Sequence, residues 1–330
     1  MHSEGEIILS RVQQIAPNFF CIDTHDLNRE QRTSSYLLID EKIALIETSA
    51  SPSVPYILDG LDELNIALED IDYVIVTHIH LDHAGGAGLF LQSCPNATFI
   101  VHPRGVSHMV DPSRLIASAK SVYGEEFELL FDPIVPIDAN RIVEIGHEQE
   151  LVLGQHKLTF YHTEGHAKHH VSMLYSATNG LFVGDTTGVR YPEMDGEAID
   201  LIIPSTSPNQ YNPETMEQSI QLYESLNASE LYFGHYGSYK NPEEAYRQVR
   251  YWTPLFLTEG KKASEISSIF QEQVHYLNAR LKELLFNYLQ ENDIPASHPV
   301  YETIPFDTIV SSMGILDYLE KIKVQQSQLK

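Results

Sequence analysis

The sequence is poor in cysteine, tryptophan and cationic side chains, and these shortages exclude several classes of protein. Its 330 residues include two cysteines and one tryptophan, and 21 lysines and arginines stand against 46 aspartates and glutamates, a formal charge of −25. The two cysteines, Cys21 and Cys94, cannot build a disulfide framework and fit a reducing compartment. So few cations argue against a nucleic-acid or anionic-membrane partner, because phosphate binding depends on Lys and Arg.

Long hydrophobic runs and a leader peptide are also missing. No apolar run approaches the roughly 18 residues of a membrane span, and residues 1–6 (MHSEGE) lack the basic and apolar regions of a secretory signal. We therefore expect a cytoplasmic protein that acts on a small-molecule substrate and has no membrane partner.

Histidine is abundant, and apolar residues are present in the proportion of a globular protein. The chain has 16 histidines, nearly as many as all its lysines and arginines, and 42% of its residues are hydrophobic. Histidine beside an excess of carboxylates indicates metal or proton chemistry. At roughly 150 residues per domain, the length suggests one large or two modest domains.

The residue pattern changes character near residue 240. Before it, short β-like runs alternate with helical ones, which is typical of an α/β fold. These runs are Ser34–Asp40, Lys42–Glu47, Ile71–Thr77, Ala97–His102, Lys157–Thr163, Val171–Ser176, Leu181–Val183 and Leu231–Phe233, with a helical pattern over Val54–Asn65. We predict a catalytic domain over residues 1–240 and a helical C-terminal extension over 241–330.

Two helical regions have more than one interpretation. An insert of about residues 103–140, with helical pieces at Val106–Val110 and Ser113–Tyr123, is either a functional lid or a cover for a sheet edge or a partner subunit. In the extension, apolar residues recur at helical spacing from Ile266 to Tyr288, and Phe306–Ile322 predicts a last helix. The apolar stripe fits core packing or a homodimer contact.

Four metal-competent side chains lie within six residues, directly after a buried-strand pattern. The segment is THIHLDHAGG from Thr77 to Gly86. Alternate residues of an extended backbone point the same way, so His78, His80 and Asp82 can converge, and His83 follows where the chain turns. Imidazole and carboxylate groups are ligands for ions such as zinc. The alternative is a loop of surface histidines.

Three distant segments share one design: a short apolar strand, a glycine and then a ligand-type residue. They are Gly165-His166, Gly184-Asp185 and Gly234-His235. Each alone is weak, because a single histidine after a strand is more often an ordinary polar group. Together with the dense cluster they predict a metal site at the strand ends.

These motifs, in this order, resemble those of the metallo-β-lactamase-fold superfamily, with the nearest likeness to its glyoxalase II-like and lactonase-like hydrolases. The resemblance spans about residues 34–236 and implies an α/β fold built as a four-layer αββα sandwich. It implies two divalent ions per chain, zinc first and iron or manganese as alternatives. One ion would be held by His78, His80 and His166, the other by Asp82, His83 and His235, with Asp185 bridging them.

The chain departs from the resembling motifs at three places. Glu47-Thr48-Ser49 replaces a common Asp-Thr-Gly, so Glu47 must reach further to support a ligand. After His166, Lys168 and His169 stand where relatives often have Pro-Gly, while His170 keeps the second histidine of that motif and is expected to orient the site. The position three residues after Asp185 is Gly188 where lactonases often carry tyrosine, with Tyr191 further on. Lys168, His169, Arg190 and Tyr191 are candidates for substrate contact, or else surface cations and core-edge residues.

The expected chemistry is hydrolysis of a small thioester, lactone or other activated ester by a hydroxide that bridges the metals. Two divalent ions supply such a nucleophile at neutral pH, and Asp82 could orient it or carry a proton. The alternatives are a mononuclear iron sulfur dioxygenase of the same fold, a phosphodiesterase, and a metal-binding scaffold without catalysis. The acidic composition disfavours the phosphodiesterase.

Overall fold

Two β-sheets form the centre of the molecule. In the computed structural model, which describes residues 11–328, the first sheet has seven strands in the order of the chain. They are β1 (Val12–Ala16), β2 (Phe19–Asp23), β3 (Ser34–Ile39), β4 (Ile43–Ile46), β5 (Ile71–Ile75), β6 (Thr98–Val101) and β7 (Ile142–Glu144). The strands from β1 to β4 pair antiparallel, and those from β4 to β7 pair parallel.

The second sheet has six strands in the order β15-β14-β11-β10-β9-β8. Its strands are β8 (Glu150–Val152), β9 (Lys157–His162), β10 (Val171–Tyr175), β11 (Gly180–Gly184), β14 (Glu230–Phe233) and β15 (Ser238–Tyr239). A separate two-stranded ribbon joins β12 (Val189–Arg190) to β13 (Ile202–Ile203).

The two sheets pack face to face over a core rich in aromatic side chains. Both sheets contribute buried rings to it: Phe19, Tyr36, Phe160, Phe182 and Tyr232. The rings of Phe19 and Tyr232 meet edge to face with centroids 4.8 Å apart, a favoured aromatic geometry. This core fixes the spacing of the two sheets, from whose strand ends the candidate site is built.

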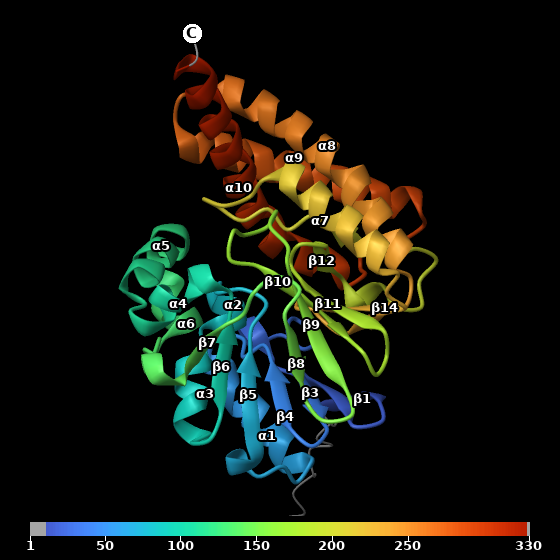
Figure 1. Cartoon of the computed structure of the whole chain (residues 1–330). Coiled ribbons are helices and arrows are strands. Elements are labelled where there is room, and N and C mark those ends of the chain that lie inside the picture. Colours follow the sequence, from blue (N-terminus) through green and yellow to red (C-terminus); the bar gives the residue numbers. More distant parts are fainter. Residues whose placement is uncertain (1–10, 329–330) are drawn as a thin grey trace, which may run out of the picture.

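Helices cover the outer face of each sheet (Figure 1). The first sheet carries α1 (Val54–Glu63) and α3 (Ala87–Ser93), and the short α2 (Leu81–Ala84) follows β5. The second sheet carries α7 (Pro213–Leu226), α8 (Pro242–Ile266), α9 (Phe270–Glu291) and α10 (Val300–Gln328). The predicted four-layer αββα sandwich with a C-terminal helical region is confirmed.

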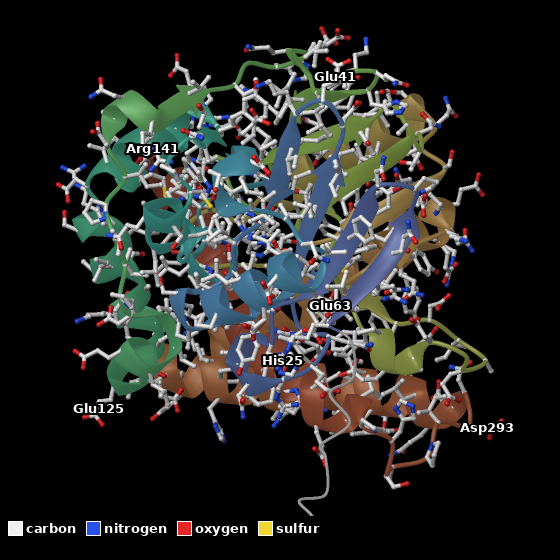
Figure 2. All side chains as sticks on the ribbon, turned by 90° about the horizontal axis from the view of Figure 1, so that it is seen from below. His25, Glu41, Glu63, Glu125, Arg141 and Asp293 are labelled. Atoms are coloured by element: carbon white, nitrogen blue, oxygen red, sulfur yellow. The ribbon has the colours of Figure 1, made fainter. Side chains whose placement is uncertain are left out.

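The insert after β6 folds into helices at the side of the sandwich. They are α4 (Pro103–Val110), α5 (Ser113–Tyr123) and α6 (Phe127–Phe131). Phe127 and Phe131 pack with Leu81 and Ala50 in a small core of their own, and α5 has no fully buried residue. Glu125, between α5 and α6, lies at the outer edge of the molecule in the perpendicular view (Figure 2).

The structure corrects two expectations for the C-terminal helices. Ile266 and Ile269 are 53% and 55% exposed, because α8 ends at Ile266 and the chain turns before α9; the buried stripe begins at Val274. The last helix starts at Val300 and runs through Pro305, whereas the sequence predicts a start at Phe306. Proline has no backbone N–H to donate within a helix, which is why Pro305 suggests that the helix begins after it.

Within residues 11–328, no helix combines the length and apolarity that a bilayer crossing requires. The expectation about the first six residues lies outside the described part of the chain.

Candidate metal centre

The histidine cluster occupies the turn between β5 and α2. His78 and His83 are buried, while His80 and Asp82 are half-buried. His80 has an extended backbone and precedes the first turn of α2, so Asp82 and His83 project from the start of that helix. The loop thus places two ligand-type side chains before the helix and two on it.

The segments that follow three strands of the second sheet bring the remaining side chains to this cluster. His166 follows β9, Asp185 follows β11 directly, and His235 follows β14. Gly184 has a φ of +48°, and a Cβ there would lie 2.4 Å from His170 Nε2. Only glycine fits such a conformation at this contact, so this residue lets the two loops touch.

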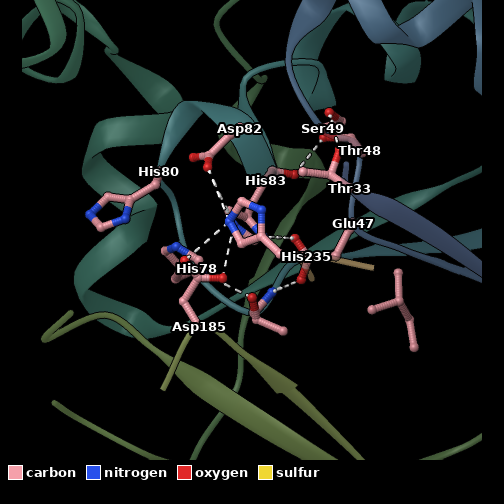
Figure 3. A network of polar contacts seen from close by, with 12 residues as sticks. Thr33, Glu47, Thr48, Ser49, His78, His80, Asp82, His83, Asp185 and His235 are labelled. Atoms are coloured by element: carbon pink, nitrogen blue, oxygen red, sulfur yellow. Dashed lines mark hydrogen bonds and ion pairs between the residues drawn. The ribbon is translucent and has the colours of Figure 1, made fainter. Parts of the chain in front are cut away.

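The structure brings all seven predicted ligand residues together. Their ligand atoms form three groups with all atoms within 4.8 Å of one another: His78, His80, His166; His78, His83, Asp185; and Asp82, His83, His235. Asp185 contacts several members: its Oδ1 lies 3.2 Å from His83 Nε2, and its Oδ2 lies 3.4 Å from His235 Nε2 (Figure 3).

Glu47 supports this cluster from behind. One carboxylate oxygen accepts a hydrogen bond from the backbone N–H of Thr77 (2.7 Å), and the other accepts one from Nδ1 of His83 (3.1 Å). Glu47 therefore does reach the ligand, from a backbone with a φ of +68°. Ser49, where the resembling motif has glycine, also takes a left-handed conformation with a φ of +52°.

The hydrogen bonds leave free lone pairs that point into the cluster. His166 Nδ1 lies 3.0 Å from the carbonyl oxygen of Ser205, so this nitrogen carries the proton and Nε2 faces His80 Nδ1 at 2.8 Å. Three buried atoms on the inner side of the cluster have no hydrogen-bond partner, His78 Nε2, His83 Nε2 and Asp185 Oδ1, the last two lying 3.2 Å apart. Buried orphan atoms of this kind on imidazole and carboxylate fit a divalent metal ion.

Electrostatics divides the histidines into two sets. Burial, followed by the neighbouring histidines, holds the pKa of His78 and His80 well below its usual value. Burial also opposes the charged form of His83 and His235, but Asp185 overcomes it and raises both pKa values. The lowered set is neutral at physiological pH, the form that binds metals.

His170 and Ser205 lie beside the cluster and bind Asp185, and of the two only His170 was predicted. His170 accepts a hydrogen bond from the backbone N–H of Asp185 at 3.2 Å and lies 2.9 Å from Thr163 Oγ1. Ser205, which was not predicted, donates its hydroxyl to Asp185 Oδ2 at 3.0 Å. Its only local signal is its place just after the short strand β13.

The four candidate substrate contacts lie outside the cavity in front of the cluster. Arg190 is buried, and its guanidinium binds Asp195 and the carbonyl oxygen of Tyr236. Tyr191 donates its hydroxyl to Asp307 at 2.7 Å. His169 is buried, and Lys168 is exposed away from the cavity.

A cavity of about 500 Å³ opens beside His80, Asp82, His166, Asp185 and His235. Asp26, Arg32 and Asp307 also line it, and none of these was predicted. Arg32 Nη1 donates to Asp307 Oδ2 at 3.1 Å, which joins the loop before β3 to α10. Arg32 and Asp307 are 275 residues apart in the sequence, and no local sequence pattern predicts that they pair.

A family model of the metallo-beta-lactamase superfamily matches residues 28–235, and the chain belongs to this superfamily. The superfamily is of the metallo-hydrolase type and generally binds divalent metals, often zinc.

Among curated relatives, a metallo-beta-lactamase fold-containing protein of Sulfurisphaera tokodaii is 28% identical over 144 residues, 43% of this chain and 51% of the relative. A protein of Methanocaldococcus jannaschii named as a probable metallo-hydrolase is 29% identical over 154 residues, 47% of this chain and 66% of the relative. The chain thus spans between half and two thirds of these relatives.

Solved structures share the fold at low identity. An archaeal superfamily protein from Sulfolobus tokodaii superposes with a TM-score of 0.63 at 20% identity, covering 90% of this chain and 98% of that one. A family member from Thermus thermophilus gives 0.66 at 16% identity, covering 94% and 95%.

Proposed function

We propose that the protein is a metal-dependent hydrolase that cleaves a small thioester, lactone or other activated ester. The observation that supports this best is the convergence of seven histidine and aspartate side chains, five of which line one cavity. The superfamily and the name of the Methanocaldococcus relative are consistent with it.

The donor set supports two ions per chain. His78, His80 and His166 would hold one ion, Asp82, His83 and His235 the other, and Asp185 would contact both. Zinc fits these ligands, as do iron and manganese. Bound ions would generate a nucleophile from water at neutral pH and polarise the bond that it attacks.

The chain's own groups would orient the ligands and handle protons. Glu47 and the Ser205 carbonyl fix the protons of His83 and His166 on the outward nitrogens, which leaves the inward nitrogens free. Asp82 has a side chain 29% exposed beside the cavity. Its carboxylate would accept a proton from the attacking water and return it to the leaving oxygen or sulfur.

The nature of the cavity wall favours an ester or thioester over a phosphodiester. Among the residues that line it, all in the described chain, Arg32 is the only lysine or arginine, and it is bound to Asp307. A phosphodiester would have few cations to meet its charge beyond the metals. A glyoxalase II-like or lactonase-like activity therefore remains our proposal for the branch.

Metal analysis and a substrate panel test the proposal. We expect about two transition-metal ions per chain and hydrolysis of the lactone or the glutathione thioester in a panel that also contains a phosphodiester and a persulfide. His80→Ala should lower the rate by at least about a hundredfold, whereas His275→Ala, an exposed histidine on α9, should not change it.

Each contrary result identifies an alternative. About one iron per chain with oxygen uptake on the persulfide would replace the hydrolase with a dioxygenase. Full activity of the His80→Ala protein would remove the site assignment, and a metal-loaded protein inert on the whole panel would favour a non-catalytic scaffold.

A further inference from the structure

One wall of the cavity is an apolar stripe of α10. The residues of this helix that line the cavity include Phe306, Ile309, Val310 and Met313. Spacings of three, four and seven residues place these side chains on one face of a helix. The three aliphatic members are half-buried and Phe306 is 40% exposed, with the Arg29 guanidinium 4.1 Å from the centre of its ring.

The insert supplies the facing wall. Leu115, Ala119 and Val122 line the cavity from α5, again at helical spacing, and Leu129 and Leu130 line it from α6. Leu129 is 80% exposed. Large apolar side chains left in the wall of a cavity usually contact an apolar ligand.

Charge restricts what this space can receive. Asp26, Asp82, Glu126 and Asp307 line the cavity, and Arg32 is bound to the last of them. Among the described residues that line the cavity, the bound Arg32 is the one lysine or arginine, so a second anionic group away from the metal cluster would meet these carboxylates without a free cation to balance them. A neutral, apolar group would meet the two helical walls and bury surface on both.

We infer that the substrate carries a hydrocarbon acyl chain, which lies between α5–α6 and the 306–313 stripe of α10 while its carbonyl group lies at His80, Asp82 and Asp185. The inference rests on the proposed hydrolase function and specifies its substrate class. The stripe of α10 lies beyond residues 28–235, the part that the family model matches.

Rates on a homologous ester series test the inference. The substrates are p-nitrophenyl acetate, butyrate, hexanoate and octanoate, with the metal-loaded full chain. Burial of each added methylene should raise kcat/KM about threefold to fourfold until the chain fills the cavity. A flat or falling series, with the acetate cleaved, would overturn the inference and leave the hydrolase function intact.

Substitutions in the stripe give a second test with a matched control. Val310→Asp puts a carboxylate in the wall and should reduce the octanoate-to-acetate ratio of kcat/KM at least about tenfold. Val310→Trp should reduce the same ratio by occupying the space of the chain. Val324→Asp and Val324→Trp, on the same helix at a position 48% exposed and outside the cavity, should leave the rates and the ratio unchanged.

A binding measurement keeps the inference testable if no ester is cleaved. Calorimetry with N-methyl alkanamides from acetamide to octanamide should show the dissociation constant falling as the chain lengthens, and Val310→Asp should abolish the trend. Equal affinities along the amide series, or equal behaviour of Val310→Asp and Val324→Asp, would refute the acyl-chain pocket.

Discussion

At the scale of single residues, Glu47 connects the backbone of the metal loop to one of its ligands. Its two carboxylate oxygens bind the Thr77 N–H and His83 Nδ1, and its backbone has a φ of +68°. Such a conformation costs energy for any residue other than glycine. The surrounding structure therefore holds Glu47 in place for both contacts.

Replacing Glu47 with glutamine should weaken metal binding without unfolding the protein. The amide is similar in size but is a weaker acceptor for His83, so we expect metal affinity to fall roughly 10- to 100-fold. Competition with a chelator of known affinity measures the change. Glu265→Gln, an exposed position on α8, serves as the control; equal affinity of the two variants would contradict the role of Glu47.

His102 should make the protein less stable in mild acid. Burial, then the nearby charges of His162 and Arg104, lowers the pKa of His102 to about 4, whereas an unfolded histidine titrates near about 6.5. Between these values the unfolded chain binds a proton that the folded chain does not. The free energy of unfolding therefore falls as the pH drops through this window.

His102→Asn isolates this contribution. His102 Nδ1 accepts a hydrogen bond from the Arg104 N–H at 3.0 Å at the start of α4, and asparagine also caps helices well. The melting temperature of the variant should therefore decline less than that of the parent between about pH 7 and about pH 4.5. If the melting temperatures of the parent and the variant decline equally over this pH range, His102 is not the responsible group.

At the scale of elements, the pair of Arg32 and Asp307 fastens α10 over the cavity. Their side chains are only 10% and 7% exposed, and Tyr191 adds a hydrogen bond to Asp307. Burying an ion pair is costly, but removing one partner is more costly, because the other charge is then left unpaired.

Arg32→Met should destabilise the protein by about 3–5 kcal/mol. Lys42→Met, which removes an ion pair with Asp72 at a lysine 51% exposed, should cost about 1 kcal/mol or less. Denaturant unfolding measures both. The double change Arg32→Met with Asp307→Leu should recover a large part of the loss; a double variant as unstable as the sum of its parts would contradict the explanation.

Elements with a strong local signal were predictable from the sequence, and those that depend on distant partners were not. The apolar run Ile71–Thr77 contains β5, and Lys157–Thr163 contains β9. The two-residue strand β12 exists only because β13 pairs with it, and it is too short to show the alternation of apolar and polar residues that predicts a strand.

The same distinction holds for the site. The seven ligand-type residues follow strands and form dense motifs, so their convergence was predictable. The contacts of Arg190 with Tyr236 and Asp195 could not be predicted, because no motif around these residues indicates them. The contacts of Asp307 with Arg32 and Tyr191 could not be predicted for the same reason.

At the scale of the whole molecule, the charge of −25 should make stability depend on salt. Like charges repel each other most in the compact state, and salt screens this repulsion. The screening length falls from roughly 30 Å at 0.01 M to roughly 8 Å at 0.15 M. We therefore expect the free energy of unfolding to rise over this range of sodium chloride in chemical denaturation with urea; a decrease would indicate that favourable ion pairs dominate.

The contact between Arg32 and Asp307 also bears on the order in which the molecule is built. It closes a loop of 275 residues, and contacts between such distant segments form late in folding. During synthesis, all seven ligand-type residues up to His235 emerge from the ribosome before the stripe of α10 has been translated. The growing chain therefore has every component of the histidine–aspartate cluster before it has the wall that we infer selects the acyl group.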